Sequence, residues 1–72
     1  MIDAGFYDAL GQAKKLLAES PFDELRNLRV ERDGDDILLR GQVHSFYYKQ
    51  LAQETVRTAT CGIHLINAVD VD

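Results

Sequence analysis

Apolar residues in the first part of the chain recur at helical spacing. They follow one another at steps of four, three and four residues, which places them on one face of a helix: Phe6, Leu10, Ala13 and Leu17. Asp3 can cap the start of this helix. A second start follows at 20–24, where Ser20 is a candidate cap and Pro21 occupies the first position, so we expect one further helical turn.

From Leu25 the apolar period changes to two, which predicts strands. Leu28 and Val30 alternate with polar residues, and the pattern resumes over 37–43. Between them, Asp33-Gly34 suits the positive φ angles of a two-residue hairpin turn.

The hairpin can pair in two registers. A turn at Asp33-Gly34 pairs Arg32 with Asp35, Val30 with Ile37, and Leu28 with Leu39, so that apolar residues meet. We favour this register, although it sets Glu31 opposite Asp36. A four-residue loop is the alternative, and it opposes Arg29 to Arg40 and Leu28 to Gly41.

A second helix and a last strand complete the pattern. Ser45 opens the helix, and a narrow stripe of mostly small or apolar residues follows it: Tyr48, Leu51, Ala52, Thr55 and Ala59. Inward-facing Gly41 leaves space for this helix to approach the sheet, and Gly62 suits the helix end. The last strand, within 63–71, points Leu65, Asn67, Val69 and Val71 inward.

These elements predict an α+β fold with one domain over 1–72. The order αββαβ gives a two-layer sandwich in which both helices pack on one face of a three-stranded mixed sheet. A strand–helix–strand unit normally crosses over right-handedly between parallel strands, so we expect the sheet order 1-2-3, with 2-1-3 as the alternative.

Composition narrows the function classes. The chain has 72 residues, a net charge of −4 and one cysteine, so it contains no internal disulfide. An acidic chain whose outer sheet face offers no aromatic residue is a poor nucleic-acid binder. We expect no signal segment, and a lone thiol suits a reducing cytoplasm.

Candidate chemistry is sparse. Cys61 and His64 have metal-ligand spacing, but parallel strands put His44 at the far end of the sheet, so we expect no metal site. The capping role accounts for Ser45, which we do not expect to act as a nucleophile. We therefore expect no enzyme activity, no catalytic residues and no cofactor.

Two surfaces are candidates for binding. Phe46, Tyr47 and Tyr48 cannot all face inward, because neighbours on a helix are about 100° apart. An exposed Phe46 or Tyr47 beside Lys49 would form a lipid- or partner-binding patch, unless Phe46 folds back over the sheet end. The second candidate is the outer sheet face, which carries Leu38, Arg40 and Ile66 and could support a homodimer.

The segment Ile37-Leu38-Leu39-Arg40-Gly41-Gln42-Val43-His44-Ser45 resembles the central signature of the BON domain family. Further along, Ala52, Ala59 and Gly62-Ile63 are similar to that family's helix alanines and glycine-aliphatic pair, and Leu65–Val71 is similar to its closing strand with Asn67 at the centre. The resemblance covers roughly 6–71. It implies structural roles for Gly41, Gly62 and Asn67.

What the resemblance implies is a domain without catalytic activity that binds phospholipid membranes or envelope partners. The expected function is therefore a binding or tethering module associated peripherally with a membrane. The alternative is a protein-interaction or homo-oligomerisation module. The family also implies an envelope or periplasmic setting, whereas the lone thiol suits the cytoplasm. Because these two indications disagree, the sequence by itself assigns no compartment.

Overall fold

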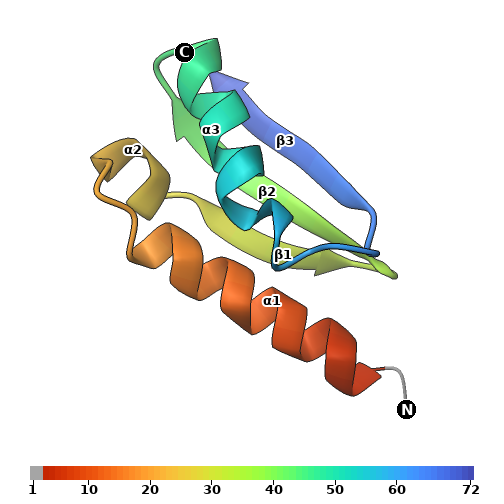
Figure 1. Ribbon diagram of the computed structural model, residues 1–72. Coiled ribbons are helices and arrows are strands. Elements are labelled where there is room, and N and C mark those ends of the chain that lie inside the picture. Colours follow the sequence, from red (N-terminus) through yellow and green to blue (C-terminus); the bar gives the residue numbers. More distant parts are fainter. Residues whose placement is uncertain (1–2) are drawn as a thin grey trace.

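The computed structural model describes residues 3–72, and side chains from residue 5 onward. It contains six elements: α1 (Asp3–Ala18), α2 (Asp23–Arg26), β1 (Arg29–Asp33), β2 (Asp36–Val43), α3 (Phe46–Arg57) and β3 (Leu65–Val71) (Figure 1). The expected cap at Asp3 lies outside the described side chains. None of the helices among the described residues is long and apolar enough to cross a membrane.

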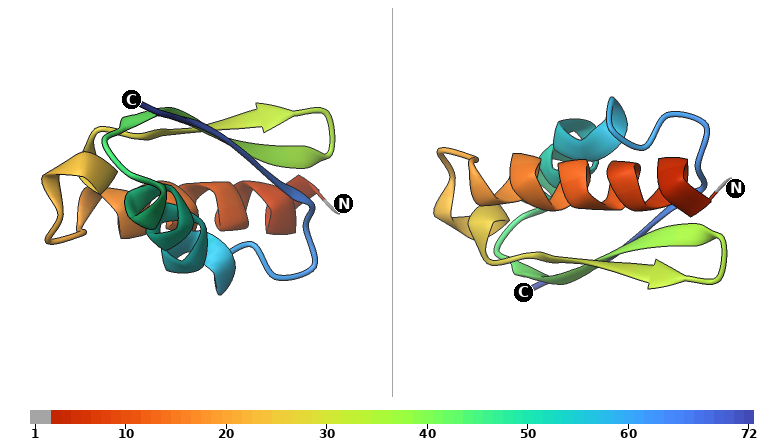
Figure 2. Two further views of the ribbon diagram at one scale, coloured as in Figure 1. Left: turned by 90° about the horizontal axis from the view of Figure 1, so that it is seen from above. Right: turned by 90° about the horizontal axis from the view of Figure 1, so that it is seen from below.

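The sheet has the predicted order and strand directions. Its order is β1-β2-β3, with β1 antiparallel to β2 and β2 parallel to β3. Both long helices cover the same face of the sheet, so the molecule has two layers and the other sheet face is bare (Figure 2). Helix α1 packs against β1, while α3 packs against β2 and β3.

The core lies between these layers and follows the predicted alternation. Ala13 and Leu17 are buried on α1, and Ile37, Leu39 and Val43 are buried on β2. Helix α3 contributes Ala52 and also Val56, which the apolar stripe read from the sequence did not include.

The favoured hairpin register is wrong by two residues. The strands pair Arg29 with Arg40, Val30 with Leu39 and Arg32 with Ile37, as in the alternative register. A turn at Gly34-Asp35, rather than a four-residue loop, closes the hairpin. Gly34 has φ +64°, and none of the described non-glycine residues has a positive φ, so Asp35 does not. A positive φ at the first turn residue alone fits a type II′ turn, whereas type I′ needs it at both.

Contacts at Gly41 and Glu31 explain this register. A Cβ on Gly41 would lie 2.6 Å from Leu28 Cδ2 and 3.3 Å from its Cα, so only glycine lets Leu28 lie opposite this position. The space at Gly41 is thus filled by Leu28 and not, as the sequence suggested, by a helix. Glu31 no longer opposes an acid; its carboxylate lies 3.5 Å from Arg29 and 3.9 Å from Arg40.

Two predicted helix boundaries also need correction. Helix α2 is a single turn, as expected, but it begins at Asp23 after the N-cap residue Phe22. Ser20 does not cap it; the Ser20 hydroxyl accepts a hydrogen bond from the Phe22 backbone N–H. Helix α3 ends at Arg57, so Gly62, with φ +86°, lies in the following turn instead of at the helix end.

The close contact between Gly41 and Leu28 predicts that a side chain at position 41 destabilises the fold. Gly41→Ala places a methyl group against Leu28 and forces a side chain to adopt φ +136°, so we expect a loss of about 3 kcal/mol in the free energy of unfolding. Urea denaturation measures it. The control is Gly11→Ala, in an open helical position, which should stabilise by up to about 1 kcal/mol. Equal stability of the Gly41→Ala variant and the parent would contradict this account.

Candidate functional site: an exposed aromatic surface

The first turn of α3 carries three consecutive aromatic residues, and a cap fixes where they point. The Ser45 hydroxyl accepts a hydrogen bond from the Tyr48 N–H, as the sequence predicts for a helix N-cap. Successive residues on the helix then point about 100° apart. Tyr48 turns toward the core and is half-buried, whereas Phe46 is 74% and Tyr47 63% exposed.

The expected exposure on this turn is therefore confirmed, and Phe46 does not fold back over the sheet. The Tyr47 and Tyr48 rings meet edge to face with centroids 5.3 Å apart. Lys49 follows them and is half-buried.

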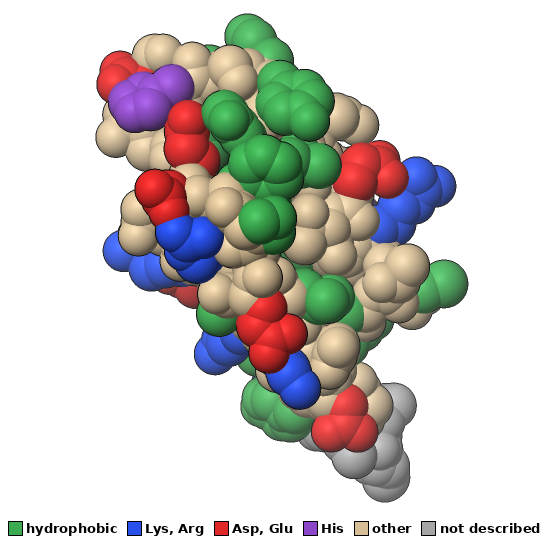
Figure 3. Space-filling view, turned by 60° about the vertical axis from the view of Figure 1, so that its left-hand side comes forward, with side chains coloured by type: hydrophobic (Ala, Val, Ile, Leu, Met, Phe, Trp, Pro, Cys, Tyr) green, Lys and Arg blue, Asp and Glu red, His purple; other side chains and the backbone are tan. Residues whose placement is uncertain are grey.

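A fourth aromatic residue joins this group from a distant part of the sequence. Phe22, 37% exposed, lies with its ring centroid 5.8 Å from that of Tyr48. We call Phe22, Phe46, Tyr47 and Tyr48 the aromatic surface. Figure 3 shows hydrophobic side chains gathered on the upper part of this side of the molecule, with charged side chains around them.

Two hydrogen-bonded contacts hold Phe22 and α2 in place. The Glu24 carboxylate accepts a hydrogen bond of 2.7 Å from the His44 N–H, which joins α2 to the residues just before the Ser45 cap. Arg26 Nη1 donates to the Ser20 carbonyl at 2.8 Å and closes the loop that carries Phe22. The aromatic surface is thus supported from both segments that build it.

The charge around the aromatic surface is mixed and mainly acidic. Asp23 and Glu24 lie in α2, and Asp72 lies 3.7 Å from the His44 ring. Arg26 forms an ion pair with Asp23, so Lys49 is the cation nearest in sequence to the exposed rings. The surface therefore offers apolar and aromatic contact rather than a positive field.

The second predicted surface is also open. Leu38 and Ile66 are directly paired between β2 and β3 on the outer sheet face, and both are half-buried. Arg40 is exposed beside Ala68 on the next row. These two aliphatic residues make a small apolar patch next to a charged cluster.

The residues considered for metal or nucleophilic chemistry do not come together. His44 follows the end of β2, whereas the His64 carbonyl accepts a hydrogen bond from Ile37 at the start of the same strand. Cys61 is exposed in the turn after α3. Among the side chains that the structure describes, from residue 5 onward, no three His, Cys, Asp or Glu residues are arranged to hold a metal ion.

Asn67 ties β3 to the helix that carries the exposed rings. Its Nδ2 donates to the Lys49 carbonyl at 3.0 Å and to Gln53 Oε1 at 3.1 Å, and its Oδ1 accepts from the Val69 N–H at 3.3 Å. The three interactions together require a side chain that offers both an N–H donor group and an oxygen acceptor, which an amide does. This contact gives a structural reason for an amide at the centre of β3.

Asn67→Asp keeps the shape but removes both donated hydrogen bonds. The carboxylate would face the Lys49 carbonyl and the Gln53 amide oxygen, so we expect a loss of about 2 kcal/mol in unfolding free energy. Gln12→Glu makes the same chemical change at an exposed site on α1 and should cost less than about 0.5 kcal/mol. Chemical denaturation of both variants tests this, and equal losses would refute the role of Asn67.

Comparisons with models of protein families, with curated proteins and with solved structures give no match to this chain.

Proposed function

We propose that this protein is a non-enzymatic binding module that associates peripherally with phospholipid membranes through its aromatic surface. The observation that carries the proposal is the exposure of Phe46 and Tyr47 side by side on the capped first turn of α3. Aromatic side chains favour the boundary between lipid headgroups and acyl chains, where apolar rings are buried and a tyrosine hydroxyl stays hydrated.

The rigidity of this turn supports the proposal. Three contacts hold the backbone beneath the rings in the free protein: the Ser45 cap, the Phe22–Tyr48 ring contact and the Glu24–His44 hydrogen bond. A preorganised surface loses less conformational entropy on binding than a flexible segment does. The resemblance of 37–45 to the BON signature agrees with a binding role.

The charges predict how such binding would depend on lipid type. The neighbouring Asp23, Glu24 and Asp72 oppose strong attraction to anionic headgroups, and Lys49 offers a single cation for a lipid phosphate. Ring insertion therefore has to supply most of the free energy. We expect binding to zwitterionic vesicles, with weak dependence on salt concentration.

Vesicle binding tests this proposal. Phe46→Ser removes an exposed ring, so partition into phosphatidylcholine vesicles should fall by roughly thirtyfold, the equivalent of about 2 kcal/mol of transfer free energy. Tyr47→Ser should act in the same direction. Co-sedimentation with sucrose-loaded vesicles measures the change.

The control is Tyr7→Ser, which removes a half-exposed tyrosine from α1, far along the chain from the aromatic surface. This variant should bind vesicles as the parent does. Absence of parent binding to both phosphatidylcholine and phosphatidylglycerol vesicles would reject the proposal. So would equal effects of the Phe46 and Tyr7 substitutions.

A second candidate function rests on the bare sheet face (Figure 2). The Leu38–Ile66 pair lies there without a covering layer among the described residues, and a second copy could cover it. This candidate is a protein-interaction or homodimerisation module.

Light scattering tests the second candidate. Dimerisation through this face would give a mass that rises with protein concentration, and Leu38→Asp would abolish the rise because it buries a carboxylate in the contact. Gln42→Glu, an exposed change on the same strand, would preserve the rise. A constant monomer mass up to millimolar concentration would reject homodimerisation.

A further inference from the structure

The free edge of β1 has the properties of a peptide-binding site. The sheet order leaves β1 paired only with β2, and no other strand of the described residues lies along its second side. Every second residue of an antiparallel edge strand presents its N–H and C=O groups to that open side. An extended peptide can pair with such groups as an added strand.

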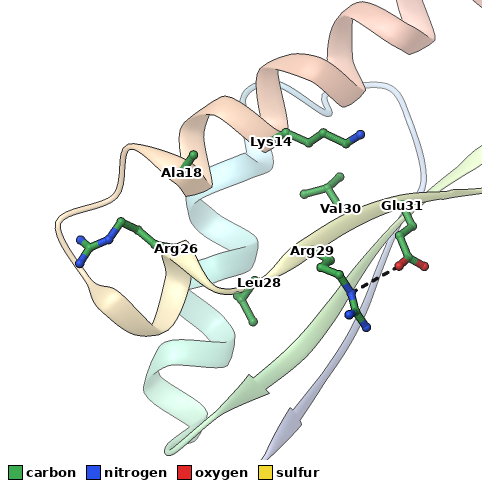
Figure 4. A pocket seen from close by; sticks show the side chains of 7 residues that line it. All are labelled: Lys14, Ala18, Arg26, Leu28, Arg29, Val30 and Glu31. Atoms are coloured by element: carbon green, nitrogen blue, oxygen red, sulfur yellow. Dashed lines mark ion pairs between the residues drawn. The ribbon is translucent and has the colours of Figure 1, made fainter.

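A groove runs along this edge between α1 and β1. It has a volume of about 320 Å³, and seven residues line it: Lys14, Ala18, Arg26, Leu28, Arg29, Val30 and Glu31. In Figure 4, Lys14 extends from α1 on the same side of the strand as Val30, while Arg29 leaves β1 on the opposite side. The edge is therefore flanked by a cation on each face of the sheet.

The charge of the groove is opposite to that of the whole molecule. The chain has eight basic and twelve acidic residues, yet three of the basic residues and one acid line the groove. Lys14 forms no ion pair with the described side chains. In the 3.5 Å Arg29–Glu31 pair the arginine side chain is 68% and the glutamate side chain 43% exposed, so water weakens the pair and an incoming carboxylate can compete with Glu31 for Arg29.

We propose that the β1 edge binds an extended peptide with two adjacent acidic residues, which adds to the sheet as a fourth strand. Successive side chains of a strand point to opposite faces. One carboxylate then meets Lys14 on the helix side, and the next meets Arg29 on the outer face. The stem of Lys14, Ala18 and Val30 offer apolar contact to flanking side chains.

The β1 edge and the aromatic surface share neither Lys14 nor Phe46, so peptide binding and membrane association can be disproved independently of each other. A competing explanation is that charged residues at the β1 edge only prevent aggregation. The two explanations differ in one respect: a protective edge repels strands without regard to the order of their acids, whereas the proposed site requires the acids to be adjacent.

The experiment uses two peptides of the same composition. The probe is acetyl-Thr-Val-Glu-Glu-Val-Thr-amide, and the control, acetyl-Thr-Glu-Val-Glu-Val-Thr-amide, places both carboxylates on one face of a strand. Amide shifts of the labelled protein are followed by NMR. We expect the probe to shift signals of residues 28–33 and of Lys14, and the control peptide to bind several-fold more weakly.

Two neighbouring lysines provide matched variants. Lys14→Glu should weaken probe binding by about tenfold, because it replaces an attractive charged contact with a repulsive one. Lys15→Glu makes the same charge change on an exposed residue that does not line the groove, and should change the affinity by less than about twofold.

Four results would overturn the proposal. The first is that the probe leaves the β1 signals unchanged, and the second is that both peptides bind equally. The third is that the Lys14 and Lys15 variants lose affinity to the same extent. The fourth is broadening of the β1 signals with protein concentration in the absence of peptide, which would assign the edge to a second copy of the chain.

Discussion

Leu28 lies against the bare backbone of Gly41, and the register of the hairpin depends on this contact. Any side chain at position 41 would meet the Leu28 methyl group or its Cα. The position of β1 along β2 also determines which side chains of these two strands meet on the outer face of the sheet. Arg29 and Glu31 are neighbours on one face of β1 in any register, whereas Arg40 of β2 comes within 4 Å of Glu31 because of this pairing, so the contact at Gly41 helps to determine the charged cluster beside the β1 edge.

The crossover rule for parallel strands predicted the sheet order. The hydrophobic pattern predicted the elements and most of the inward residues, because both depend on its period, but it missed Val56. It could not predict the hairpin register. A slip of two residues keeps every inward side chain inward, so apolar alternation does not distinguish the two pairings. The choice depends on the steric fit of Leu28 to Gly41 and on the φ of Gly34, and neither follows from the pattern alone.

The sequence predicted only part of the aromatic surface, namely the part that depends on local helix geometry. Three consecutive aromatic residues after a serine cap cannot all be buried, and this follows from helix geometry. The contribution of Phe22 was not predictable, because it requires a contact between residues more than twenty positions apart. The groove at β1 was not predicted from the sequence either, because Lys14 and Arg29 lie at the same edge only when α1 is packed against β1.

Helix α2 connects the two surfaces, although it is only four residues long. Arg26 lines the groove and also bonds to the loop that carries Phe22, while Glu24 bonds to the backbone just before α3. A substitution of Arg26 would therefore disturb both surfaces and could not assign a loss of binding to either. Lys14 on α1 and Phe46 on α3 each belong to one surface, so changes at these positions separate peptide binding from membrane association.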